Sequence, residues 1–273
     1  MRFLTITTGC LLIGLLWSVN GPCQLPGKYP ATLSKIDTSI WLKETRGIRD
    51  ILEDAKGNLW FSSPDYVARL CEDEMYYFSE KDGLGITGNL HEDANGTLWV
   101  ENGFRAFKYN GENFSEEKID RIQGSNNLWI QRGLSHSDTA YTQPGLYEVT
   151  RKGTHFHPLP VTQHIHNKYL YFPSTKARSG KDGTIWIGTM EKVFGFKNSN
   201  FITIGRAEMG RQQDERQMGI RGIFIDSWGK LWIADNGAGI FVFDGTKTEN
   251  FTWKQQPDEG SSDNNPLHRA FSI

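Results

Sequence analysis

The sequence predicts an all-β fold of the β-propeller type, and three observations support this. A short phrase recurs along the chain: a few apolar residues, an Asp-x-x-Gly turn, and a Leu-Trp or Ile-Trp pair that opens the next strand. The tryptophans of this phrase lie 39, 30, 57 and 46 residues apart, 43 on average, which is typical of one propeller blade per repeat. The composition agrees, because 29 glycines and 9 tryptophans suit many short strands and tight turns.

Each copy of the phrase supplies the structural positions of one blade. The Asp side chain bonds its own downstream backbone and the Gly accepts a positive φ, so the pair favours a tight hairpin between the first two strands. The Trp is expected to pack between neighbouring blades, where a large apolar area is needed. The structural repeat residues predicted in this way are Trp60, Trp99, Trp129, Trp186, Trp232, Asp54, Gly57, Asp93, Gly96, Gly183, Asp226 and Gly229.

The repeats predict about five full four-stranded blades and a partial sixth within residues 47–273. The third copy is degraded, and it carries an insertion over residues 131–144. A polar stretch before the fifth copy, residues 205–219, predicts a loop or a short helix. The copies lie near residues 48–84, 86–119, 120–163, 174–204 and 219–253, with the partial copy at 267–273.

The two ends of this region raise the question of ring closure. Residues 267–273 match the beginning of a repeat, with Arg269 at the position that Arg49 and Arg221 occupy in other copies. Pairing of this segment with a strand from the leader, residues 24–46, would close the ring and remove exposed sheet edges. Alternatively, the chain is a truncated piece of a longer array. The pattern leaves both possibilities open.

Residues 1–23 have the features of a signal peptide. Met1 and Arg2 give a positive start, and an apolar core of about 15 residues follows, which is short for a membrane span. Gly21 and Cys23 are small residues ahead of a cleavage site at Gln24; alternatively, Cys23 is a lipidated first residue. We therefore expect a periplasmic or secreted protein with no transmembrane segment after signal removal.

The cysteines predict a fold that is held together by its core. Cys10 lies in the signal and Cys23 at its edge, so Cys71 is expected to be alone in the mature domain. One cysteine cannot form an internal disulfide, and we expect Cys71 to be a small packed side chain on a strand.

Catalytic and metal chemistry has little support in the sequence. The pairs His155/His157 and His164/His166 would each share one face of a strand, but no Cys or carboxylate accompanies them in a metal-binding pattern. Residues 135–138 (SHSD) have the residue types of a catalytic triad without its geometry. We expect no cofactor, no metal and no catalytic residue. The net charge of −2, without a basic run, argues against nucleic acid as a partner.

The repeats resemble the two-component regulator propeller family. The matching stretches are IRDILEDAKGNLWFSS, TIWIGT and GIRGIFIDSWGKLWIADNGAGIFVF, within residues 47–252. The resemblance implies a bacterial extracytoplasmic sensor region, of a kind often fused to membrane histidine kinases and linked to glycan sensing. The sequence departs from that arrangement because it lacks the family's β-sandwich, membrane segment and kinase. Binding is therefore the property that we expect this chain to share.

The ligand site is expected over the central channel. Loops that enter the first strand and leave the second strand of each blade would meet on one face of the ring. Polar side chains in these loops suit a saccharide, with arginines that bind carboxylates in bidentate fashion. The predicted ligand-binding residues are Arg49, Glu101, Asn102, Arg132, Arg221, Asp235 and Asn236.

Three hypotheses for the function follow. The first is a non-catalytic ligand-binding or sensor-like module for a saccharide or a protein partner, with the oligomeric state left open. The second is an enzyme that cleaves a polysaccharide, which requires carboxylates that converge on the channel mouth; Glu101 and Asp235 are the candidates. The third is a truncated sensor fragment or a protein-interaction scaffold.

Overall fold

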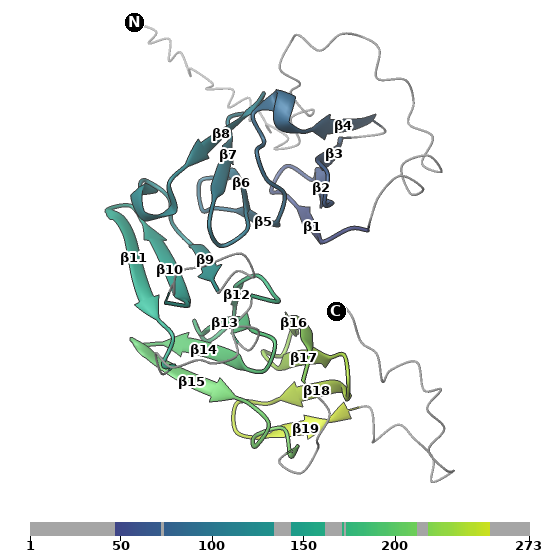
Figure 1. The fold of residues 1–273 in the computed structure, drawn as a ribbon, viewed down its shortest axis with the longest axis vertical. Helices are drawn as coiled ribbons and strands as arrows, with labels where there is room; N and C mark the ends of the chain where they lie inside the picture. Colours follow the sequence, from purple (N-terminus) through teal and green to yellow (C-terminus); the bar gives the residue numbers. More distant parts are fainter. Residues whose placement is uncertain are drawn as a thin grey trace, which may run out of the picture.

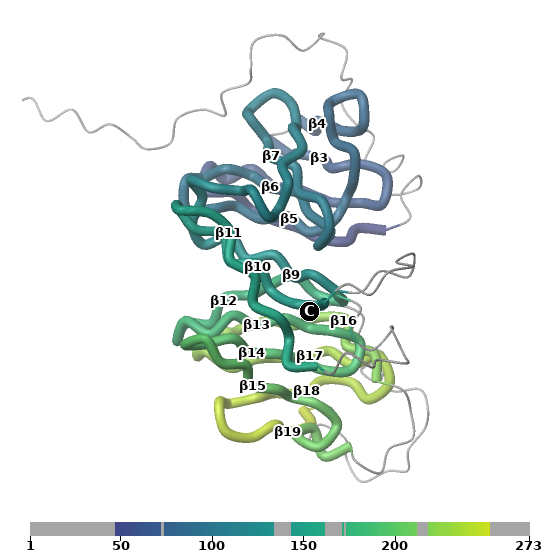
Figure 2. Tube along the Cα trace, turned by 60° about the vertical axis from the view of Figure 1, so that its left-hand side comes forward, coloured from purple at the N-terminus to yellow at the C-terminus, as the bar shows by residue number. Residues whose placement is uncertain are grey.

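The computed structural model describes residues 47–71, 74–133, 143–161, 171, 173–211 and 218–251. In this part of the chain, five antiparallel sheets follow one another around a common centre as the blades of a β-propeller (Figure 1). Strands pair in sequence order within each sheet, so the first strand of a blade lies nearest the centre and the last lies at the periphery. Figure 2 shows successive blades beside one another in chain order. The predicted all-β propeller is confirmed.

Blades 1 and 2 each have four strands. Blade 1 contains β1 (Asp50–Glu53), β2 (Leu59–Ser62), β3 (Val67–Cys71) and β4 (Glu74–Phe78). A 3-10 helix, η1 (Glu80–Asp82), leads toward blade 2. Blade 2 contains β5 (Asn89–Glu92), β6 (Leu98–Glu101), β7 (Ala106–Tyr109) and β8 (Phe114–Glu117).

Blades 4 and 5 repeat the four-stranded arrangement. Blade 4 contains β12 (Arg178–Ser179), β13 (Ile185–Gly188), β14 (Val193–Lys197) and β15 (Asn200–Ile204). Blade 5 contains β16 (Ile220–Ile225), β17 (Leu231–Asp235), β18 (Gly239–Phe243) and β19 (Thr248–Asn250).

Blade 3 differs from the predicted pattern, because its described residues form three strands. These are β9 (Leu128–Arg132), β10 (Gly145–Thr150) and β11 (Gly153–Pro158). The segment before β9 contains the 3-10 helix η2 (Ile119–Arg121) where the other blades have their first strand. Gly124 and Asn127 adopt positive φ values of 78° and 60°. A chain that turns at these two positions leaves the extended region that a strand requires.

Several predictions concern residues outside the described part of the chain. These are the signal peptide, the lipid-anchor alternative at Cys23, the leader, and ring closure by residues 267–273. Within the described residues, no helix is both long enough and apolar enough to cross a membrane.

One prediction, that Cys71 is unpaired, is wrong. Cys71 is buried on β3, as expected for a packed side chain, but it is disulfide-bonded rather than alone. Its partner lies outside the described residues. The prediction was wrong because it assigned the other two cysteines to the signal peptide and its edge, and so left Cys71 without a partner. That assignment says nothing about which sulfur atoms lie within bonding distance.

The apolar core is divided among the contacts between neighbouring blades. Four clusters of buried residues join blades 1 and 2, 2 and 3, 3 and 4, and 4 and 5. The repeat tryptophans contribute to these contacts. The ring of Trp60 lies 5.1 Å from that of Tyr109 in blade 2, and the ring of Trp186 lies 5.7 Å from that of Phe243 in blade 5. Aromatic pairs at this separation add to the stabilisation that apolar burial provides.

In blades 1, 2 and 5, the turn aspartate also binds the repeat tryptophan. Asp54, Asp93 and Asp226 each accept a hydrogen bond of 2.9 Å from Nε1 of the Trp six residues later. The other carboxylate oxygen accepts backbone N–H groups of the same turn. One carboxylate therefore holds both the hairpin and the side chain that packs between blades. Blade 4 has Gly180 at this position.

We predict that acid destabilises the fold through these aspartates. Burial alone would raise the pKa of Asp54, but hydrogen bonds from Trp60 and Asn58 lower it overall. Burial would likewise raise the pKa of Asp93, but hydrogen bonds from Ser125 and Trp99 lower it overall. The hydrogen bond from Trp232 lowers the pKa of Asp226. Because the folded-state pKa is lowered, this contribution to stability is complete above the unfolded-state pKa and is lost as the pH falls below it.

The test is thermal unfolding between pH 7 and pH 3. The melting temperature should fall steeply below about pH 4, where carboxyl groups of the unfolded chain take up protons. An Asp226→Asn variant should lose less on acidification than the wild-type protein. A melting temperature that rises between pH 4 and pH 3 would contradict the prediction.

Candidate functional site

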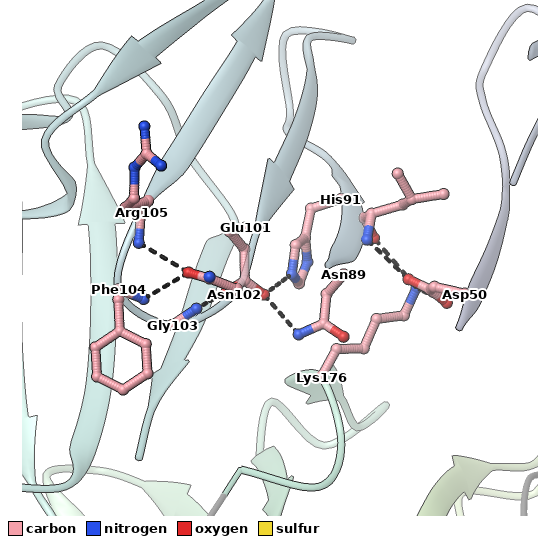
Figure 3. A network of polar contacts seen from close by, with 10 residues as sticks. Asp50, Asn89, His91, Glu101, Asn102, Gly103, Phe104, Arg105 and Lys176 are labelled. Atoms are coloured by element: carbon pink, nitrogen blue, oxygen red, sulfur yellow. Dashed lines mark hydrogen bonds and ion pairs between the residues drawn. The ribbon is translucent and has the colours of Figure 1, made fainter. Parts of the chain in front are cut away.

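The innermost strands of three blades meet in a buried polar network (Figure 3). Lys176, two residues before β12, places its Nζ 2.7 and 2.9 Å from the carboxylate oxygens of Asp50 on β1. The same ammonium group donates to the carbonyl of Leu90 on β5 at 3.1 Å. Asp50 in turn accepts the backbone N–H of Leu90 at 2.8 Å. Blades 1, 2 and 4 are therefore joined at one ion pair.

This ion pair is removed from solvent. The side chains of Lys176 and Asp50 are 8% and 9% exposed. Burial lowers the pKa of Lys176 from its ordinary value, and the nearby carboxylate of Asp50 opposes this. Burial also lowers the pKa of Arg178 on β12, again against the effect of Asp50. The network thus concentrates charge in a place where removal of one partner leaves the other desolvated.

Glu101, at the end of β6, is fully buried and has both carboxylate oxygens engaged. Its Oε1 accepts Nδ2 of Asn89 at 2.8 Å and lies 2.9 Å from Nε2 of His91 (Figure 3). Its Oε2 accepts the backbone N–H of Gly103 at 2.6 Å. The carboxylate therefore connects β5 to the loop that leaves β6, below the surface of the ring.

Asp235 has the same role at the end of β17 in blade 5. It is fully buried, accepts the backbone N–H groups of Gly219 and Gly237 at 3.0 and 2.9 Å, and lies 3.1 Å from Nη1 of Arg211. A general acid or base must come within hydrogen-bond distance of the proton that it transfers. Glu101 and Asp235 are both 0% exposed, and in this structure their carboxylates bind the backbone of the loops around them.

Four other predicted ligand residues lie near the start of a first strand or just after the end of a second strand. Arg49 and Arg221 are exposed near the starts of β1 and β16. Asn102 and Asn236 are half-buried in the loops that follow β6 and β17, each next to one of the buried carboxylates. Asn102 accepts the backbone N–H groups of the two residues at the tip of its loop, at 3.1 and 3.0 Å (Figure 3). We call Arg49, Asn102, Arg221 and Asn236 the rim.

Arg132, the remaining predicted ligand residue, lies at the end of β9 beside a hollow of about 320 Å³ between blades 2 and 3. Its Nη1 donates to the hydroxyl of Tyr147 at 2.6 Å. Its Nε is buried and has no hydrogen-bond partner among the described residues. Lys118 lines the same hollow. The lining combines these basic groups with the carboxylates of Glu116, Glu117 and Asp120.

The histidine pairs do not build a metal site in the described part of the chain. His157 on β11 bonds Glu148 at 2.9 Å, and His155 is exposed. No group of three His, Cys, Asp or Glu side chains is gathered for a metal among the described residues. The second histidine pair and residues 135–138 lie outside them.

Sequence reasoning did not find Asp50, Lys176, Asn89 or His91. The available signal was a charged residue, Asp50, at the start of the innermost strand of a repeat. Nothing local identifies its partner, because Lys176 is 126 residues away in the chain.

No protein-family model matches the sequence, and no curated protein matches it. Several solved structures are similar in fold. A streptogramin B lyase shares 15% identity over 75% of this chain and 68% of its own, with a TM-score of 0.55. The H270A virginiamycin B lyase from Staphylococcus aureus, solved with quinupristin, shares 13% identity over 76% and 70% of the two chains, with a TM-score of 0.54.

A third similar structure is the extracellular domain of a protein described as a hybrid two-component system from B. thetaiotaomicron. It shares 16% identity with a TM-score of 0.53, and the match covers 81% of this chain but 31% of that one. Identities this low show the fold alone. Both the lyases and the extracellular domain of the two-component system share this fold, so the fold does not decide between binding and catalysis.

Proposed function

We propose that this protein is a non-catalytic, sensor-like propeller outside the cytoplasm that binds a saccharide over its central channel. The observation that supports this most directly is the division of charge at the site. Asp50 and Lys176 are buried and paired with each other, and Glu101 and Asp235 are buried at the ends of their strands, whereas the rim presents exposed arginines and half-buried asparagines.

The rim has the chemistry that an acidic oligosaccharide requires. Arg49 and Arg221 offer guanidinium groups, which bind carboxylates with two parallel hydrogen bonds. Asn102 offers the N–H groups of its amide, since its oxygen is engaged within its own loop, and Asn236 offers an amide that can both donate to and accept from sugar hydroxyl groups. In this proposal Glu101 and Asp235 position the loops that carry the asparagines, and Arg132 adds a further guanidinium group in blade 3.

The proposal is tested by thermal unfolding of the protein with a panel of neutral and uronic-acid oligosaccharides. A ligand that binds the folded state raises the melting temperature in a saturable manner. We expect one acidic glycan class to do so. An Arg49→Met/Arg221→Met double variant should lose most of the shift, whereas Arg151→Met, an exposed arginine in the turn between β10 and β11, should retain it.

Two results would argue against the proposal. A shift that persists in the double variant would place the ligand elsewhere on the molecule. A wild-type melting temperature that no glycan changes would favour a protein partner instead.

A further inference from the structure

Arg69 is a buried cation without a carboxylate partner among the described residues. It lies in the middle of β3 and is 5% exposed. Its neighbours across the sheet are Trp60 on β2 and Tyr76 on β4. The guanidinium carbon lies 5.4 Å and 5.0 Å from the centres of these two rings, and 5.9 Å from that of Tyr109 in blade 2. The positive charge is thus surrounded by aromatic rings.

The hydrogen bonding of this guanidinium is incomplete. Nη1 donates to the hydroxyl of Tyr109 at 3.4 Å, which is a long bond. That hydroxyl is itself committed as a donor to the carbonyl of Gly111 at 2.6 Å. Nε and Nη2 of Arg69 are buried and have no partner in the described part of the chain. Burial of a charge is costly without a counter-charge and full hydrogen bonding, and ring contacts compensate only part of that cost.

Arg69 lines a hollow of about 460 Å³ between blades 1 and 2. This volume falls within the range of about 300–1,000 Å³ that small-molecule sites occupy. We call it the blade 1–2 hollow. Its lining includes Trp60, Arg69, Tyr109, two lysines (Lys56 and Lys108) and two acidic residues (Asp54 and Glu92).

The two carboxylates of this lining are already engaged by the protein. Asp54 accepts hydrogen bonds from Asn58 and from the indole of Trp60. Glu92 accepts the backbone N–H of Ala55 with both oxygens, at 3.1 and 2.9 Å. Lys56 and Lys108 are exposed at the hollow. The groups left to meet a ligand are therefore mainly basic and aromatic.

Comparison of the blades shows that the fold does not require a cation at this position. The residue paired with the repeat tryptophan across the second and third strands differs in every blade. It is Arg69, Lys108, Glu148, Gly195 and Val242 in blades 1 to 5. Since blade 5 accommodates a valine, the buried guanidinium of blade 1 is a local feature of the contact with blade 2.

We propose that the blade 1–2 hollow binds the carboxylate of a small acidic molecule of monosaccharide size, with Arg69 as its main charge partner. The ligand carboxylate would accept a hydrogen bond from Nη1 of Arg69 in place of the hydroxyl of Tyr109. Lys56 and Lys108 would attract the anion to the opening of the hollow. Trp60 and Tyr109 supply apolar surface for the rest of the ligand. This site is separate from the rim, because it is lined by the turns that join first to second and third to fourth strands.

The test compares D-glucuronate with D-glucose as probes of thermal unfolding, at equal concentration and with sodium chloride added to match the ionic strength. We expect a saturable rise in melting temperature with glucuronate and none with glucose. Arg69→Met should raise the half-saturating concentration by about tenfold or more, which corresponds to loss of one charge-assisted contact. Arg105→Met, which removes an exposed arginine paired with Glu116 outside the hollow, should leave it unchanged.

Each outcome supports or overturns the proposed site in the blade 1–2 hollow. An unshifted wild-type protein, or a full shift in Arg69→Met, overturns the proposal. A shift that is lost in Arg49→Met/Arg221→Met but kept in Arg69→Met assigns the acid to the rim, which overturns this proposal and supports the proposed function. If Arg69→Met does not unfold cooperatively, Lys56→Met/Lys108→Met replaces it, and an undiminished shift in that variant overturns the proposal.

Discussion

Replacement of Asp93 by alanine is expected to lower the free energy of unfolding by about 3–5 kcal/mol. Asp93 is 6% exposed. It accepts the indole N–H of Trp99 at 2.9 Å, the backbone N–H groups of Asn95 and Thr97 at 2.8 and 3.1 Å, and the hydroxyl of Ser125. Removal of one buried acceptor that serves several donors leaves those donors desolvated without a partner.

The effect extends beyond the hairpin because Ser125 belongs to blade 3. The segment before β9 has no first strand, and it is attached to blade 2 by Asp93 and by two neighbouring bonds. Ala94 N–H donates to the carbonyl of Asn126, and Asn95 Nδ2 donates to that of Gly124, both at 3.0 Å. Loss of Asp93 therefore loosens the contact between blades 2 and 3 as well as the turn.

Urea denaturation followed by fluorescence measures this change. Asp226→Ala is the matched control, since it removes the equivalent aspartate of blade 5, which binds its turn and Trp232. We expect a smaller loss there. Equal losses for Asp93→Ala and Asp226→Ala would show that the contact with Ser125 contributes nothing.

Replacement of Lys176 by methionine should cost about 3–5 kcal/mol, because it leaves the buried carboxylate of Asp50 without its partner. The backbone contact to Leu90 is lost at the same time. Replacement of both ends, as Asp50→Asn/Lys176→Met, should recover part of the loss, since the carboxylate that Lys176→Met leaves unpaired is then also removed.

A double-mutant cycle with Asp50→Asn, Lys176→Met and the pair measures the coupling free energy. Lys197→Met serves as control, because the pair of Lys197 with Asp182 has the same 2.7 Å distance but is 45% and 59% exposed. That variant should lose no more than about 1 kcal/mol. A Lys176→Met variant as stable as Lys197→Met, or a double variant no more stable than Lys176→Met, would contradict the role assigned to the ion pair.

The amino-acid sequence by itself determined the propeller class, because the signal is local. The bond from Trp60 to Asp54 spans six residues, and the turn between them is set by the same carboxylate. The same turn with its Asp–Trp hydrogen bond forms in blades 1, 2 and 5, where the sequence repeats these residues. The spacing of the repeats along the chain therefore predicts the succession of blades. Blade 3 departs from the pattern where the local geometry changes, with Asn127 in the left-handed region just before β9.

Only the tertiary structure decided which charged residues face solvent and which are buried in pairs. The sequence correctly places Glu101 near the end of a second strand, but its burial depends on Asn89 and His91 on the strand beside it. The pairing of Lys176 with Asp50 spans 126 residues, and the surroundings of Arg69 include a ring from the next blade. Hydrogen bonds within a turn are encoded by neighbouring residues, whereas desolvation and charge pairing depend on segments that folding brings together.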